Sequence, residues 1–118
     1  MGEYVQRYLS ILRIELLDLE SDLEAMERLM ERRYQSQEIT HYVSEENRSF
    51  IRHEVTSIQN IINELNSLDF SDVTSVDCLI ERIDTMVMKK SEEYDLPESI
   101  RRYIKRKLDK IKEFVSMD

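Results

Sequence analysis

The segment from Val5 to Tyr34 is the sequence feature that most constrains the fold. Its apolar residues recur at alternating steps of four and three, the heptad spacing of a helix that packs lengthwise on another helix. No glycine or proline interrupts the segment. Such a helix spans about 45 Å at about 1.5 Å per residue, so the rest of the chain must pack along it. The heptad positions are Val5, Leu9, Leu12, Leu16, Leu19, Leu23, Met26 and Met30.

The composition indicates an all-α protein. The 118 residues include one glycine and one proline, whereas sheet proteins need turn residues at many corners. No apolar run has the length of roughly 18 residues that a membrane-spanning helix requires, and no secretory signal is visible. The single cysteine, Cys78, has no partner for an internal disulfide. We therefore expect a reduced thiol and a cytoplasmic location.

The net charge of −8 is distributed unevenly. Residues 1–96 hold 10 basic and 21 acidic side chains, a net charge of −11, and residues 97–118 hold 7 basic and 4 acidic ones, a net charge of +3. An acidic body disfavours nonspecific binding of nucleic acid. We expect the basic end to dock on the body, on a second copy or on an acidic partner.

Four helices in one domain, residues 1–118, follow from the apolar spacing. Each predicted helix has apolar residues on one face at a period near 3.6. The breaks between them coincide with capping residues or with the single proline. The predicted helices cover residues 3–34, 45–68, 75–94 and 97–115.

The sequence allows two positions for the start of the second helix. Ser44 followed by Glu45 and Glu46 has the pattern of an N-cap and two acidic side chains that complement the helix dipole. This pattern predicts a turn over residues 35–43. Continuous helix from about Gln37 is the alternative.

The third helix has a capping pattern at its start. Thr74 and Asp77 resemble a capping box, with Val73 and Cys78 at the two positions of a hydrophobic staple. We therefore expect the Cys78 thiol to be packed rather than reactive.

The single proline precedes the fourth helix. Asp95 is the predicted N-cap, Pro97 is tolerated in a first helical turn, and Glu98 can reach back to the cap. The third helix is therefore expected to end just before Asp95.

The helix lengths predict an all-α, antiparallel, up-down four-helix bundle whose first two helices extend beyond the last two. The first helix has a wide apolar arc as far as Leu19, which calls for partners on more than one side. From Glu20 to Tyr34 the arc is narrow, which calls for one partner. The narrow half also carries a stripe of carboxylates, expected to be solvated, at Glu20, Glu24, Glu27 and Glu31.

Patterns for metal or nucleophilic chemistry are weak in this chain. Glu38 and His41 have the Glu-x-x-His spacing of di-iron bundles, but those proteins need a second such motif and two further glutamates. The only glycine, at position 2, cannot form a phosphate-binding loop. We predict no catalytic residue, metal site or cofactor.

A six-residue motif, Arg48-Ser-Phe-Ile-Arg-His53, resembles the Arg, four residues, His signature of the HEPN family. Members of that family are all-helical bundles, many of them metal-independent ribonucleases or toxins. The resemblance implies that Arg48 holds a phosphate oxygen and that His53 moves a proton. The alternative is a solvated helix start in which Arg48 and Arg52 lie near the acidic first helix.

The favoured function is that of a non-enzymatic helical interaction module, such as an adaptor, a chaperone or a subunit of a complex. It would bind another protein, or a second copy as a homodimer, along the first helix and through the basic last helix. The alternatives are a HEPN-like ribonuclease and a nucleic-acid-binding module that uses the basic helix. The candidate partner-binding residues are Leu23, Met26, Leu29, Met30, Tyr34, Arg102, Arg106 and Lys110.

Overall fold

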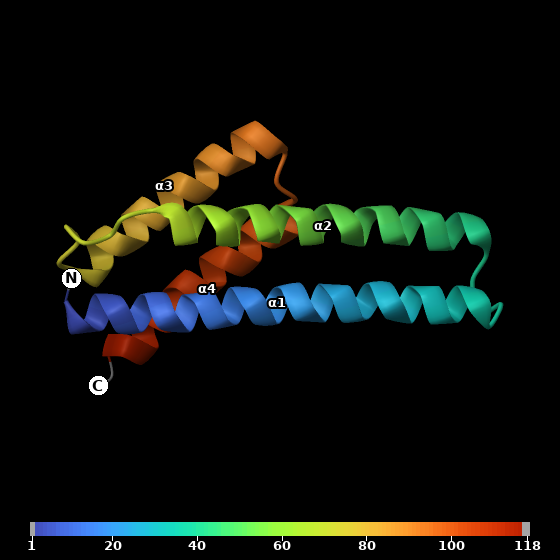
Figure 1. Ribbon diagram of the computed structural model, residues 1–118, viewed down its shortest axis with the longest axis horizontal. Helices are drawn as coiled ribbons and strands as arrows, with labels where there is room; N and C mark the ends of the chain where they lie inside the picture. The colour runs from blue at the N-terminus through green and yellow to red at the C-terminus, as the bar shows by residue number, and fades with distance from the viewer. Residues whose placement is uncertain (1, 117–118) are drawn as a thin grey trace.

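A computed structural model describes residues 2–116, and these residues form four α-helices and no strand (Figure 1). The predicted all-α four-helix bundle is confirmed. None of the described helices is apolar enough over a sufficient length to cross a membrane. The helices are α1 (Glu3–Gln35), α2 (His41–Ser67), α3 (Val76–Tyr94) and α4 (Glu98–Ser116).

The two long helices form an antiparallel hairpin, and the two short ones cover only one end of it (Figure 1). The molecule measures 54 × 31 × 20 Å, so it is elongated along the hairpin. We call the projecting part of the hairpin, residues 24–52, the arm. We call the remaining described residues, where all four helices meet, the base. The predicted extension of the first two helices is therefore present.

The base has a continuous apolar core. Tyr8 and Leu12 of α1 and Val55 and Ile58 of α2 are completely buried. The Tyr8 hydroxyl donates a hydrogen bond of 2.7 Å to the carbonyl oxygen of Leu108, which ties α1 to α4. Most of the apolar face predicted for α4 is buried, at Ile100, Ile104, Leu108, Ile111 and Val115. Phe114 has the same spacing but is 54% exposed.

The start of α2 differs from the prediction. Thr40 is the N-cap, and its hydroxyl accepts a hydrogen bond of 3.2 Å from the backbone N–H of Val43. Ser44 is not a cap, because its backbone N–H already donates to the Thr40 carbonyl within the helix. Its small side chain is buried in the hairpin instead. The predicted start at residue 45 was therefore wrong by one helical turn.

The first turn of α3 also differs from the prediction. The N-cap is Ser75, whose hydroxyl accepts a hydrogen bond of 3.1 Å from the backbone N–H of Cys78. This one-residue shift rotates the staple positions. Val73 is buried as expected, but Cys78 is exposed, and the prediction of a packed thiol was wrong.

The turn between α3 and α4 corrects the predicted role of Asp95. Asp95 has the left-handed backbone conformation, with φ of 50°, and it ends α3 rather than capping α4. The Pro97 carbonyl accepts the first hydrogen bonds of α4, from the backbone N–H groups of Ile100 and Arg101. Leu96, between them, is buried and anchors the turn in the core.

The wide apolar arc predicted for the first half of α1 is only partly covered. Val5, Leu9 and Leu16 are buried, but Ile14 and Leu17 are 59% and 50% exposed. The reason is that α2 and α4 occupy two sides of α1 and leave its outer face open. Two exposed aliphatic side chains thus remain on the outside of the base.

Candidate interaction surface

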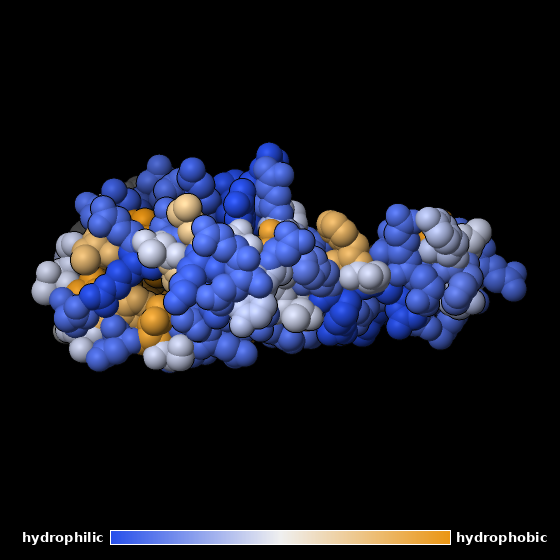
Figure 2. Space-filling view, turned by 90° about the horizontal axis from the view of Figure 1, so that it is seen from above, coloured by the Kyte–Doolittle hydropathy of each residue, from blue (hydrophilic) through white to orange (hydrophobic). Residues whose placement is uncertain are grey.

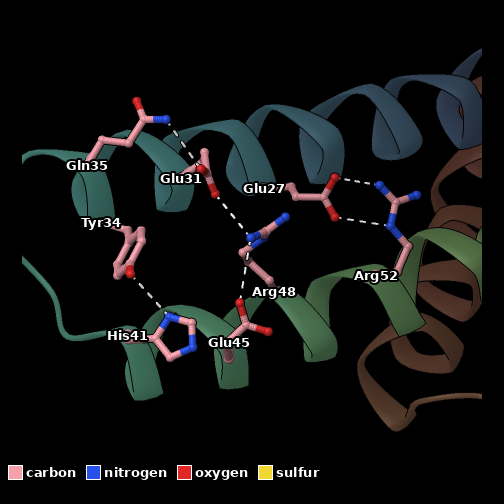
Figure 3. A network of polar contacts seen from close by, with 8 residues as sticks. All are labelled: Glu27, Glu31, Tyr34, Gln35, His41, Glu45, Arg48 and Arg52. Atoms are coloured by element: carbon pink, nitrogen blue, oxygen red, sulfur yellow. Dashed lines mark hydrogen bonds and ion pairs between the residues drawn. The ribbon is translucent and has the colours of Figure 1, made fainter.

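Ion pairs between the two helices hold the arm together (Figure 3). The Arg52 guanidinium binds both carboxylate oxygens of Glu27, with an Nε–Oε2 distance of 3.1 Å. One turn further along the arm, Arg48 lies 3.1 Å from Glu31 and 3.7 Å from Glu45. Half of the carboxylate stripe predicted to be solvated therefore faces α2.

The tip of the arm is closed by a helix-ending turn and by an aromatic pair. Gln37 has a φ of 62°, and its backbone N–H donates to the Tyr34 carbonyl while that of Glu38 donates to the Arg33 carbonyl. These two hydrogen bonds form a Schellman motif. The Tyr34 hydroxyl lies 3.2 Å from Nδ1 of His41, and the two ring centroids are 5.5 Å apart.

The interior of the arm is polar for a helix–helix contact. Among the 23 buried apolar side chains of the described residues, only Ile51 belongs to the arm. The Ser44 hydroxyl is buried without a hydrogen-bond partner in the described structure. The Asn47 side-chain amide donates to the sulfur of Met30 at 3.6 Å, and no oxygen acceptor for it is found among residues 2–116. Apolar packing alone therefore holds the arm only weakly.

The predicted partner-binding residues of α1 are covered to different degrees. Leu23 is buried, because it joins the base core where α2 runs alongside, and its predicted availability was wrong. Leu29 and Met30 are half-buried. Met26 is 48% exposed and Tyr34 37% exposed. Within the arm, the available apolar surface of α1 is therefore a narrow seam centred on Met26.

This seam lies beyond the N-terminal end of α4. The Ser99 hydroxyl, at the start of α4, donates a hydrogen bond of 2.7 Å to Glu54, so the part of α2 before Glu54 lies beyond α4. On α1, Leu19 packs against the core, and Met26 lies two turns further along the same face. The arm therefore continues the bundle without the helices that would complete it.

The hydrophobic surface of the molecule is not evenly spread. Seen from above, hydrophobic residues gather over the base, and the arm is mostly hydrophilic (Figure 2). An interaction through the arm would therefore combine a narrow apolar seam with polar contacts at its edges.

The basic face of α4 carries both signs of charge. Arg102 pairs with Glu98 at 2.8 Å, and Asp109 and Glu113 lie on the same exposed side of the helix. No ion pair of Arg106 or Lys110 is found within the described part of the chain. Two other lysines bind neighbouring helices, Lys107 to Glu15 at 2.9 Å and Lys112 to Asp77 at 2.8 Å.

The two residues of the HEPN-like motif face different parts of the molecule. Arg48 points across the hairpin to Glu31, whereas Nε2 of His53 donates a 3.1 Å hydrogen bond to the backbone carbonyl of Asp95. Within one chain these side chains do not meet in a common cleft. The ion pairs of Arg48 and Arg52 with α1 match the structural alternative for this motif.

The Glu-x-x-His pair lies at the tip of the arm. Glu38 is in the turn and His41 is the first residue of α2, and both are exposed. Over residues 2–116, no group of three or more potential ligands could hold a metal ion.

Comparison of the chain with known protein families, curated proteins and solved structures finds no match.

Proposed function

We propose that this protein is a helical protein–protein interaction module that acts by binding rather than by catalysis, with the arm as its contact surface. The observation that carries the proposal is the position of the first turn of α4 beside Glu54, because beyond this point α1 and α2 continue without α4. Met26, Leu29 and Met30 then have apolar surface that a further helix would cover. The natural occupant is a helix or a helical hairpin.

A second copy of the chain is the partner that the charge distribution favours. The arm holds 5 basic and 6 acidic side chains, a net charge of −1, so two arms repel each other little. The rest of residues 1–96 holds 5 basic and 15 acidic side chains, a net charge of −10. Two arms packed antiparallel would form a four-helix bundle and bury apolar surface worth about 25 cal/mol per Å².

Charge argues against one alternative function and geometry against the other. Nucleic-acid binding through Arg102, Arg106 and Lys110 would have to overcome the acidic side chains among them. RNA cleavage would need Arg48 and His53 near one phosphate.

A cytoplasmic location remains part of the proposal, because Cys78 has no disulfide partner within the chain.

Light scattering coupled to size exclusion tests the proposal through a matched pair of variants. Met26 in the arm and Leu17 on the base are 48% and 50% exposed, so an aspartate at either position should leave the monomer folded. We expect the wild type to exceed 14.2 kDa, Met26→Asp to fall to that mass, and Leu17→Asp to behave as the wild type.

Two results would contradict the proposal. One is a wild-type mass of 14.2 kDa at every protein concentration. The other is an assembly that Leu17→Asp disrupts and Met26→Asp leaves intact, because that assembly would use the outer face of the base. Circular dichroism of both variants should show that their helices are retained.

A further inference from the structure

A groove at the junction of the base and the arm lies between the end of α3, the start of α4 and the middle of α2. It has a volume of about 880 Å³ and is lined by side chains of all three helices and of the α3–α4 turn. Two large apolar side chains on its walls, Phe50 and Met88, are 60% and 61% exposed. The groove does not include Met26 and is separate from the α1 seam of the arm.

The path of α3 creates this groove. The buried residues of α3 end at Val87, and from Met88 to Tyr94 none of its residues is buried. In Figure 1 the C-terminal half of α3 diverges from α2. Leu96, in the turn after α3, is 7% exposed and packs in the core. The α3–α4 turn therefore forms the floor of the groove.

The turn at the floor is held in place on both sides. The His53 Nε2–H group of α2 donates to the Asp95 carbonyl oxygen at 3.1 Å. Ser99, at the start of α4, donates to the buried Glu54 carboxylate at 2.7 Å. The groove is therefore largely preformed, which lowers the entropic cost of binding.

The charged side chains of the lining indicate that the ligand is positively charged. Glu92, Asp95 and Glu98 line the groove with one cation, Arg101. Glu98 is paired with Arg102, but no ion pair of the Glu92 or Asp95 carboxylates is found among residues 2–116. The strongly acidic base adds a field that attracts cations over a longer range.

We infer that this groove binds a basic amphipathic helix of another protein. Phe50 and Met88 would hold its apolar side chains, the thioether adapting to their shape. Its Lys or Arg side chains would meet the Glu92 and Asp95 carboxylates and could stack on the Phe50 ring. This surface includes Phe50 of the arm but none of the α1 seam residues Met26, Leu29 and Met30.

The test uses a fluorescent helical peptide built of leucine and lysine, and the same peptide with glutamate in place of lysine. Anisotropy at low salt should show saturable binding of the lysine peptide only. Phe50→Ala with Met88→Ala should weaken it by about tenfold or more. Ile14→Ala with Leu17→Ala removes two comparably exposed side chains outside the groove and should leave the affinity unchanged.

A second double variant separates charge from apolar contact. Glu92→Gln with Asp95→Asn keeps the side-chain shapes, and asparagine tolerates the left-handed conformation at position 95. It should weaken binding by about threefold or more and reduce the salt dependence. Met26→Asp, which tests the arm, should not alter the affinity.

Three results would overturn the inference. The first is no binding of the lysine peptide at low salt. The second is equal binding of the glutamate peptide. The third is an affinity that follows Leu17 or Met26 rather than Phe50 and Met88, since the peptide would then occupy another apolar surface. Circular dichroism of each variant excludes unfolding as the cause of a loss.

Discussion

The base and the arm are made from the same two helices, yet different forces hold them. In the base, α1 and α2 bury apolar side chains against α3 and α4, and Tyr8 joins α1 to α4. In the arm, the same two helices meet through Glu27–Arg52 and Glu31–Arg48. The stability of α1 and α2 therefore differs along their length, although each is a continuous helix.

The difference indicates that the base is the more stable region and that the arm depends on the base for its stability. Ion pairs between partly exposed side chains contribute at most about 1 kcal/mol each, whereas each buried apolar side chain contributes roughly 1.5–3 kcal/mol. A region with one buried apolar side chain, Ile51, opens more readily than a region with the rest of the core. Binding of a partner to the arm would therefore stabilise the arm more than the base.

The largest expected effect is on the base core. Leu12→Ala removes a completely buried side chain and should lower the free energy of unfolding by about 2–5 kcal/mol in urea denaturation. Met30→Ala, at a half-buried position of the arm seam, should cost less than about 2 kcal/mol. Equal losses would show that the arm and the base have equally developed cores.

An intermediate effect is expected from the hydrogen bond between α1 and α4. Tyr8→Phe should cost about 1 kcal/mol at neutral pH. Burial, and to a lesser degree Asp109, raises the pKa of Tyr8 above its usual 10.0. The native state thus holds this proton more tightly than the unfolded state does, and the stabilisation is complete below pH 10 and is lost as the pH rises further.

Urea titrations between neutral pH and pH 11 measure this dependence. The wild type should lose stability more steeply above pH 10 than Tyr8→Phe does. Parallel curves for the two proteins would mean that the Tyr8 phenol is not held neutral by the base core.

The smallest expected effect is at the tip of the arm. Gln37 has a φ of 62°, and a side chain in this left-handed conformation costs about 1–2 kcal/mol that glycine avoids. Gln37→Gly should therefore stabilise the tip by up to about 1 kcal/mol. Amide hydrogen exchange measures this gain, and exchange near residue 37 should be slower in the variant. Ser36→Gly, at a φ of −82°, is the control and should give no gain. A gain spread over the whole base would mean that the arm and base open together.

The apolar spacing predicted the number of helices, the hairpin and its overhang. It failed at caps, where local patterns compete. Ser44 with Glu45 looks like a helix start, but Thr40 caps one turn earlier, and the small Ser44 side chain fits inside the hairpin. At α3, a cap one residue later than predicted turned Cys78 outward.

The candidate surfaces were less predictable than the helices. The spacing identified Met26, but it could not show that Leu23 is covered, because that depends on where α2 lies. The carboxylate stripe was expected to be solvated, but Glu27 and Glu31 pair with α2. The signal for these pairs was the alternative that placed Arg48 and Arg52 near the acidic first helix. The groove depends on the angle at which α3 leaves α2, which no spacing along the chain encodes.

The central claim is that the arm is the part of the molecule that a partner completes. Amide hydrogen exchange, followed by mass spectrometry at low and high protein concentration, tests it most directly. We predict that exchange in residues 24–52 slows as the concentration rises and that exchange in the base core around Leu12 and Ile58 does not change. Exchange in the arm that is independent of concentration, while the outer face around Leu17 becomes protected, would contradict the claim.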